Sequence, residues 1–167
     1  MSIYIGLGAN LSHPKFGHPT RTLARALATL NDRGVRLVKL SPWYRTAPVP
    51  VSDQPWYFNA VAEIATGLGP DALLATLHGV EDRFGRERSV RNAPRFIDLD
   101  LLDYRSIYKD LNQIGISEIP HVRLKERAFV LLPLRDVAPD WHHPVTGTPI
   151  DTLIAALPPE QVAERLP

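Results

Sequence analysis

The chain has 167 residues, of which 44% are hydrophobic and 22% are charged, and its formal net charge is +1. These values are typical of a soluble globular protein and predict one domain over residues 1–167, large enough to bury a hydrophobic core. The near-zero net charge argues against nucleic acid or an anionic membrane as a partner, and the absence of cysteine excludes disulfides and thiolate catalysis. Because we find neither a signal-peptide pattern nor an apolar run of membrane-spanning length, we expect a cytoplasmic protein.

The first part of the chain predicts a strand, a helix and a second strand. Ile3–Leu7 is a short apolar run that ends in glycine, which favours a central strand. We expect Gly6–Asn10 to form a tight turn whose backbone approaches another group; a dinucleotide fingerprint would require glycine at Leu11. Thr20–Asn31 carries apolar residues at helical spacing, and Val35–Tyr44 predicts the second strand.

A proline-rich segment separates this strand from the third. Thr46–Pro55 is expected to be a stiff, exposed loop. Tyr57–Ala65 alternates like a strand, which places Tyr57 and Asn59 on the same face. The pattern alone favours an edge-strand surface for this pair, although an aromatic ring and an amide could together hold a flat heterocycle.

Pro70–Phe84 predicts a helix with a core-facing apolar stripe. Glu81 lies near its C-terminal end, where the helix dipole disfavours an acid, so a role for Glu81 in a site stays open.

The segment Gly85–Asp100 places opposite charges in two adjoining blocks. The first block contains Arg86, Arg88, Arg91 and Arg95. The second block alternates apolar and acidic residues, which is typical of a strand, so Asp98 and Asp100 should share one face about 6.5–7 Å apart. The apolar partners Ile97, Leu99 and Leu101 should then enter the core.

The two blocks together favour a metal-nucleotide site. Two neighbouring carboxylates repel each other unless a cation lies between them, and Mg²⁺ prefers oxygen ligands and phosphate. Arginine side chains bind phosphate through forked donors. Three other interpretations remain: a solvated surface, a nucleic-acid-binding module, and a different D-x-D enzyme such as a sugar-nucleotide transferase.

The last third of the chain is less informative. Asp103–Ile119 is polar and irregular, and Arg123–Val137 suits a helix that extends as far as Pro133. Pro149–Leu157 predicts a short amphipathic helix, and the tail after about residue 158 is expected to be loosely held.

Four motifs in this order resemble the hydroxymethyl-dihydropterin pyrophosphokinase family of the folate pathway. They are Y-I-G-L-G-A-N, Y-R-T-A-P with D-Q-P-W-Y-F-N, G-R-E-R…P-R-F-I-D-L-D, and P-H-x-R-x-x-E-R-A-F-V. The resemblance implies an α+β fold, a ferredoxin-like sandwich with a mainly antiparallel sheet and helices on both sides. It also implies transfer of pyrophosphate from ATP to the hydroxymethyl oxygen of the pterin, with AMP as the second product, and we expect a monomer acting on these small molecules.

The resemblance also implies a role for individual residues. Asp98 and Asp100 match aspartates that bind two Mg²⁺ ions, and Arg86 and Arg95 match catalytic arginines that hold the triphosphate. The implied ATP-binding residues are Glu81 (on the ribose side), Arg88, Arg91, His121 and Arg127. The implied pterin-binding residues are Thr46, Ala47, Val49, Tyr57, Asn59 and Phe129, with the two aromatic rings on either side of the pterin.

Overall fold

A six-stranded sheet forms the centre of the protein, seen here in a computed structural model that describes residues 1–48, 50–85, 94–110, 118–121 and 123–167. The strands run in the order β5–β1–β4–β3–β8, and β2 also pairs with β4. All of these pairings are antiparallel. The bounds are β1 Ile3–Ala9, β2 Val35–Leu40, β3 Tyr44–Thr46, β4 Tyr57–Thr66, β5 Asp98–Tyr104 and β8 Ala163–Arg165.

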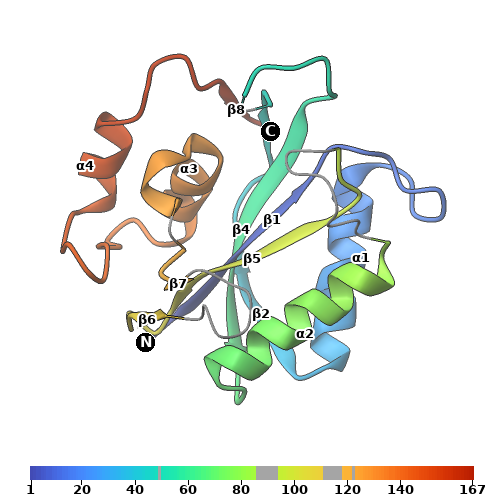
Figure 1. The fold of residues 1–167 in the computed structure, drawn as a ribbon, viewed down its shortest axis with the longest axis horizontal. Coiled ribbons are helices and arrows are strands. Elements are labelled where there is room, and N and C mark those ends of the chain that lie inside the picture. The colour runs from blue at the N-terminus through green and yellow to red at the C-terminus, as the bar shows by residue number, and fades with distance from the viewer. Residues whose placement is uncertain (49, 86–93, 111–117, 122) are drawn as a thin grey trace.

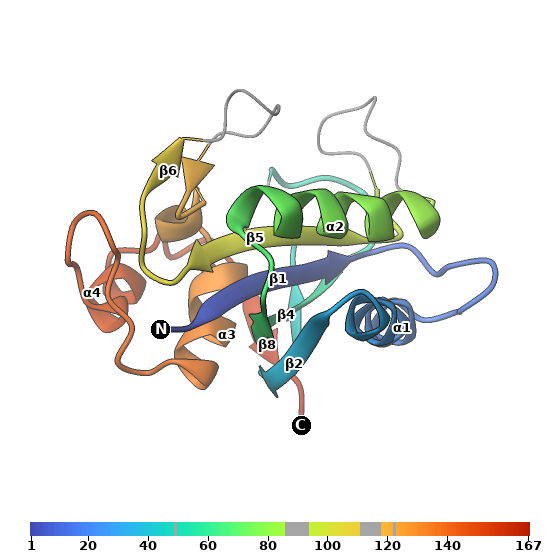
Figure 2. The ribbon, with the colours of Figure 1, turned by 90° about the horizontal axis from the view of Figure 1, so that it is seen from below.

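Helices cover both faces of the sheet. The helices α1 (Pro19–Asp32) and α2 (Pro70–Arg83) lie on one face, and α3 (Ala128–Val137) and α4 (Ile150–Ala155) lie on the other (Figure 1). The view from below separates the same layers (Figure 2). The succession β1–α1–β2–β4–α2–β5 with the spatial order β5–β1–β4–β2 is the ferredoxin-like arrangement, so the predicted α+β sandwich is confirmed.

Each face of the sheet has its own apolar core. The core under α1 and α2 includes Ile5, Leu23 and Leu77, which are fully buried. The core under α3 and α4 includes Val61 and Leu131. The strands β1, β4 and β5 contribute to both cores because successive side chains point to opposite faces.

The strand β5 carries the acidic motif, and its alternation is as predicted. Ile97, Leu99 and Leu101 enter the core beneath α1 and α2. Asp98 and Asp100, half-buried, point to the opposite face, toward the layer that contains α3. The chain therefore brings these carboxylates to the side of the sheet where the cavity described below lies.

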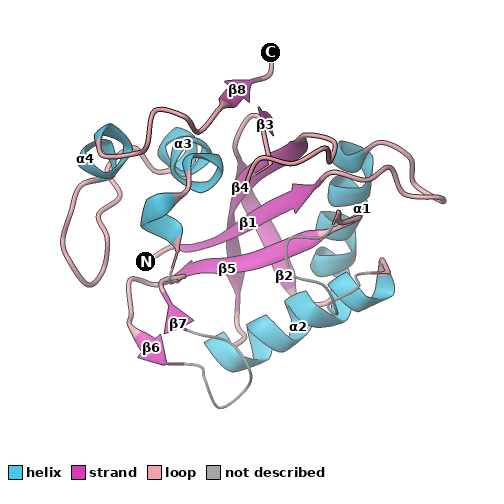
Figure 3. Cartoon of the chain, turned by 45° about the horizontal axis from the view of Figure 1, so that its top comes forward, coloured by secondary structure: helices cyan, strands magenta, loops and turns pink. Residues whose placement is uncertain are grey.

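The predicted second strand was too long. The strand β2 ends at Leu40, and Tyr44 begins the separate strand β3, so both pair with β4 at different places (Figure 3). Pro42 lies between them and has no N–H group to contribute to a ladder, which explains the break. The turn expected over Gly6–Asn10 was also wrong, because β1 continues to Ala9.

The predicted helix over Arg123–Val137 is two helices. A 3₁₀ turn, η2 (Leu124–Glu126), comes first, and Arg127 with an extended backbone separates it from α3. The helix α3 continues through Pro133 instead of ending there. The burial of Leu131, Pro133 and Leu134 against the sheet offsets the hydrogen bond that proline cannot donate.

The C-terminal tail joins the sheet, contrary to the loosely held tail that we expected. Its strand β8 pairs with β3, and the carbonyl of Val162 accepts a hydrogen bond from the backbone N–H of Ala47. Within Asp103–Ile119, β5 extends to Tyr104, and a small ribbon forms from β6 (Lys109–Asp110) and β7 (Glu118–Ile119). Over the described residues, none of the helices combines the length and apolar character needed to cross a membrane.

Candidate active site

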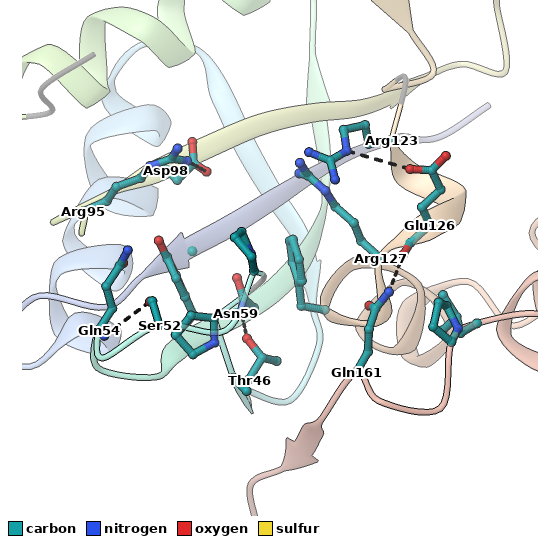
Figure 4. A pocket seen from close by; sticks show the side chains of 18 of the residues that line it. Thr46, Ser52, Gln54, Asn59, Arg95, Asp98, Arg123, Glu126, Arg127 and Gln161 are labelled. Carbon is teal, nitrogen blue, oxygen red and sulfur yellow. Dashed lines mark hydrogen bonds and ion pairs between the residues drawn. The ribbon is translucent and has the colours of Figure 1, made fainter. Parts of the chain in front are cut away.

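A cavity of about 650 Å³ opens between the sheet, the start of α3 and the C-terminal tail. Figure 4 shows that Arg95 and Asp98 lie on one side, Asn59 and Thr46 at the base, and Arg127 and Gln161 opposite Arg95. The lining residues are Gly8, Thr46, Ala47, Pro48, Pro50, Ser52, Gln54, Tyr57, Asn59, Arg95, Asp98, Arg123, Lys125, Glu126, Arg127, Phe129, Ala156, Leu157, Pro158 and Gln161.

The acidic part of the site is held in place from behind by α2. Glu81, only 1% exposed, accepts a 2.9 Å hydrogen bond through Oε2 from the backbone N–H of Leu99. Leu99 lies between Asp98 and Asp100, so the bond connects α2 to the centre of the D-L-D segment. The side chain of Glu81 lies in the core and does not line the cavity, and its implied ribose-side role stays a prediction.

Arg95 is bound to the site by its side chain and by its backbone. Its Nη1 donates to Oδ2 of Asp98 at 2.8 Å. Its backbone N–H donates to Oδ1 of Asn10, and its carbonyl accepts from the backbone N–H groups of Asn10 and Leu11. Nδ2 of Asn10 in turn donates to Oε1 of Gln54 and to the carbonyl of Pro55. Asn10 thus connects the end of the arginine segment to the loop between β3 and β4.

Arg127 provides a second cation, from the side of the cavity formed by α3. Burial lowers the pKa of its guanidinium, while the charges of Asp100 and Asp98 act to raise it. The charges of both carboxylates of the D-L-D segment therefore act on one arginine. The guanidinium carbon also lies over the ring of Phe129, 5.3 Å from its centroid.

His121 is neutral near pH 7. Burial, with help from the charge of Arg127, lowers its pKa to about 4. Nδ1 accepts a 3.2 Å hydrogen bond from the backbone N–H of Arg123, which assigns the proton of the neutral ring to Nε2. His121 can therefore donate one hydrogen bond to an anionic group without adding charge to the site.

The base of the cavity suits a flat, polar heterocycle. Tyr57 and Phe129 contribute aromatic rings from β4 and α3. Asn59 and Thr46 are buried, and Nδ2 of Asn59 donates to Oγ1 of Thr46 at 2.7 Å. This bond determines the orientation of the amide, so one edge of a bound ring could be recognised by hydrogen bonds.

The space beside this amide depends on Gly8. A Cβ atom at position 8 would lie 2.6 Å from Oδ1 of Asn59, a distance that real Cβ atoms do not tolerate. We expected the backbone of the glycine segment to approach another group closely. This approach occurs at Gly8 inside β1, and the other group is the side chain of Asn59, which lines the cavity.

The acidic residues fit a hard divalent cation. Among the described residues, no three His, Cys, Asp or Glu side chains gather as a complete protein-made metal site. Mg²⁺ commonly uses one or two carboxylates and completes its octahedron with water and substrate phosphate. Asp98 and Asp100, on one face of β5, provide this donor set.

The structure brings most of the predicted site residues to one place. Thr46, Ala47, Tyr57, Asn59, Arg95, Asp98, Arg127 and Phe129 line the cavity, and Asp100 and His121 are electrostatically coupled to its charged groups. Val49, Arg86, Arg88 and Arg91 lie outside the described residues.

Several lining or supporting residues were missed. Gln54 and Arg123 stand within the D-Q-P-W-Y-F-N and P-H-x-R motifs, so their positions in those motifs could have indicated them. Asn10 ends the Y-I-G-L-G-A-N motif. Gln161 stands in a tail with no recognisable motif, and only the fold reveals it.

Comparisons with known proteins agree with this geometry. The family model described as 7,8-dihydro-6-hydroxymethylpterin-pyrophosphokinase (HPPK) matches residues 4–139. The 2-amino-4-hydroxy-6-hydroxymethyldihydropteridine pyrophosphokinase of Pseudomonas aeruginosa is 39% identical over 165 residues, covering 99% of this chain and 96% of the relative.

Two longer proteins are also similar. The folic acid synthesis protein fol1 of Pneumocystis carinii is 35% identical over 99% of this chain, which spans only 21% of that protein. A crystal structure of HPPK-DHPS from Plasmodium falciparum superposes with a TM-score of 0.69 at 15% identity, covering 92% of this chain and 41% of the other. The structural match supports the fold.

Proposed function

The chain belongs to the 7,8-dihydro-6-hydroxymethylpterin-pyrophosphokinase family, and from this premise we propose that it transfers the β,γ-pyrophosphoryl group of ATP to 6-hydroxymethyl-7,8-dihydropterin. The acceptor atom is the oxygen of the hydroxymethyl group, and the products are AMP and the pterin diphosphate. The reaction would be a step of folate synthesis, the process for which the fungal relative is named.

One observation supports this proposal most strongly: a single cavity contains groups suited to both substrates. Asp98 and Arg95 form its charged side, while Asn59 and two aromatic residues form a base suited to a heterocycle. A hydroxymethyl group extending from the heterocycle would then approach a triphosphate held at the charged side. Holding both reactants together removes much of the entropic barrier to reaction.

At the pterin end, each group has a distinct role. The rings of Tyr57 and Phe129 would contact the faces of the bicyclic ring system. Asn59, oriented by Thr46, would recognise its polar edge, which carries donors and acceptors side by side. Ala47 would form part of the wall, and Val49 keeps the pterin-side role that the resemblance implies.

At the phosphate end, arginines stabilise charge. A lone pair of the acceptor oxygen forms a bond to the β-phosphorus, the bond from that phosphorus to the α,β-bridging oxygen breaks, and the oxygen leaves with AMP. The hydroxyl proton passes to solvent. Arg95 and Arg127 would neutralise charge that develops on the bridging and transferred oxygens, and Nε2 of His121 would donate to a phosphate oxygen. Arg86, Arg88 and Arg91 keep the phosphate-side roles that the resemblance implies.

Asp98 and Asp100 would hold two Mg²⁺ ions, which when bound neutralise the triphosphate and lower the pKa of the attacking hydroxyl. Arg95 now contacts Oδ2 of Asp98, and a metal held at that oxygen would leave Arg95 available to contact phosphate. The pair would keep both side chains in position before nucleotide arrives.

A nucleic-acid-binding module is the weaker hypothesis. Phosphate backbones bind best to positively charged surfaces, whereas here Arg95 pairs with Asp98 in a cavity and the charges of both acids act on Arg127. The monomeric state and the cytoplasmic location stay predictions.

Mixing protein, Mg²⁺, ATP and 6-hydroxymethyl-7,8-dihydropterin tests the proposal. We expect AMP and pterin diphosphate in equal amounts, and neither product when any one component is left out. AMP formation that is independent of the pterin would instead indicate a hydrolase.

A further inference from the structure

Gln161 joins the C-terminal tail to the segment that carries Arg127. It lies between α4 and β8, is half-buried, and lines the cavity. Its Nε2 donates to the carbonyl of Glu126 at 2.7 Å, and its Oε1 accepts from the backbone N–H of Ala128 at 2.8 Å. One side chain thus binds the residue before Arg127 and the residue after it. Figure 4 shows the bond to Glu126.

These two bonds occur at the junction between η2 and α3. Arg127 has an extended conformation, with φ −120° and ψ 114°, between η2 and the first turn of α3. No side chain of the N-cap residue caps α3, so the N–H of Ala128 would otherwise be one of the unpaired donors at a helix start. Gln161 provides this cap from a segment distant in sequence.

The neighbouring backbone attaches the same tail to the opposite wall of the cavity. The carbonyl of Val162 accepts from the N–H of Ala47 at 3.1 Å, and Ala163 pairs with Thr46. Ala47 and Thr46 both line the cavity, as do Arg127 and Phe129 on the α3 side. The tail is therefore a bridge between the wall formed by β3 and the wall formed by η2 and α3.

We propose that Gln161 is a positioning residue that sets the direction of the Arg127 side chain, and with it the binding of the nucleotide phosphates. The proposal rests on the proposed function, in which Arg127 binds ATP. Arg127 leaves the backbone between the two residues that Gln161 holds, so a shift of this short segment would move the guanidinium relative to Asp98 and Asp100. A displacement of about 1 Å at a phosphate-binding group is enough to reduce catalysis severely.

The alternative is that Gln161 only stabilises the fold by capping α3. The variant Gln161→Met separates the two roles, since it keeps approximately the same volume and loses both hydrogen bonds. His18→Ala is the matched control for stability, because His18 caps α1 through its side chain and does not line the cavity. Glu160→Ala controls for a change in the tail itself, because Glu160 is exposed and also outside the cavity.

The measurements are thermal stability, kcat and KM for both substrates, and affinity for α,β-methylene-ATP. In this analogue a CH₂ group replaces the oxygen that bridges the α- and β-phosphorus atoms, so the bond cannot be cleaved. We expect Gln161→Met to weaken α,β-methylene-ATP binding and kcat/KM for ATP by about tenfold or more, while KM for the pterin changes less than threefold. His18→Ala should lose comparable thermal stability with kcat/KM within twofold of wild type, and Glu160→Ala should match wild type in all measurements.

A Gln161→Met protein that loses stability like His18→Ala but keeps its rate and nucleotide affinity would overturn the inference while leaving the proposed function intact. An inactive wild-type protein that forms no AMP would overturn the proposed function, and this inference with it. The two failures are distinguished by the wild-type assay alone.

Discussion

Arg95 and Asp98 form an ion pair at the start of β5, with 2.8 Å between Nη1 and Oδ2 and with side chains 22% and 20% exposed. The pair joins the end of the arginine segment to the acidic strand. Each side chain therefore holds the other in position before a substrate binds. Substitution of either residue tests its role in the reaction.

Asp98→Asn should abolish Mg²⁺-dependent AMP formation, with a rate lower by two orders of magnitude or more, because an amide binds a divalent cation far less well than a carboxylate does. The change keeps the size of the side chain, so the fold should persist by circular dichroism. Asp140→Asn, in an exposed loop outside the cavity, is the control and should keep the wild-type rate. Full turnover by Asp98→Asn would remove this residue from the metal site.

Arg95→Ala should lower kcat by about 10²–10³, because a cation that stabilises developing charge on phosphate oxygens is lost. Affinity for the pterin should change little, since Tyr57 and Asn59 form that end of the cavity. Steady-state kinetics with pterin titration by fluorescence will distinguish the two effects. Arg36→Ala on the exposed part of β2 serves as the control, and an Arg95→Ala enzyme as fast as this control would contradict a role in transfer.

Gly8→Ala should weaken pterin binding by about tenfold or more, because the new methyl group would displace the amide of Asn59 from its bond to Thr46. ATP affinity should stay within about twofold. Gly67→Ala introduces the same methyl group into open space and is expected to bind pterin as wild type does. Equal pterin affinities for the two variants would contradict the role of Gly8 in keeping the amide of Asn59 in place.

Stability should fall as the pH is lowered from 6.5 to about 4. His121 has a pKa lowered from 6.5 to about 4 by burial, so within this window the unfolded chain binds a proton that the folded chain does not. The contribution is up to about 3 kcal/mol, fully present above pH 6.5 and lost as the pH falls to 4. Urea unfolding at several pH values should show that the free energy of unfolding depends less on pH in His121→Gln than in wild type. The variant His142→Gln, at an exposed site, should show the wild-type dependence. The same dependence of the free energy of unfolding on pH in His121→Gln and wild type would contradict the lowered pKa of His121.

The spacing of apolar residues was sufficient to predict the strands and helices in which this spacing is regular. The D-L-D strand was predicted with the correct face, because Leu99 and Leu101 can enter the core only if Asp98 and Asp100 face away from it. The positions of prolines were the least reliable indicator of where a strand or helix ends. Pro42 does interrupt a strand, whereas Pro133 lies inside α3, where burial in the second core outweighs the missing hydrogen bond.

Tertiary contacts explain what the sequence could not reveal. The resemblance implied a ribose-side role for Glu81, and the structure adds a contact that was not predicted, between its carboxylate and the backbone of Leu99 inside the core. The tail was expected to be loosely held, yet pairing with β3 and the side chain of Gln161 hold it against the cavity. Neither partner is close in sequence, so no local pattern could indicate either contact.

The most direct test of the account is to follow both products from ATP labelled with ³²P at the α- or the γ-phosphate. If the β-phosphorus is attacked, α-label must appear in AMP and γ-label in the pterin product, in equal amounts and only with Mg²⁺ present. Formation of ADP together with a pterin monophosphate would contradict the account, because it would show that a single γ-phosphoryl group is transferred.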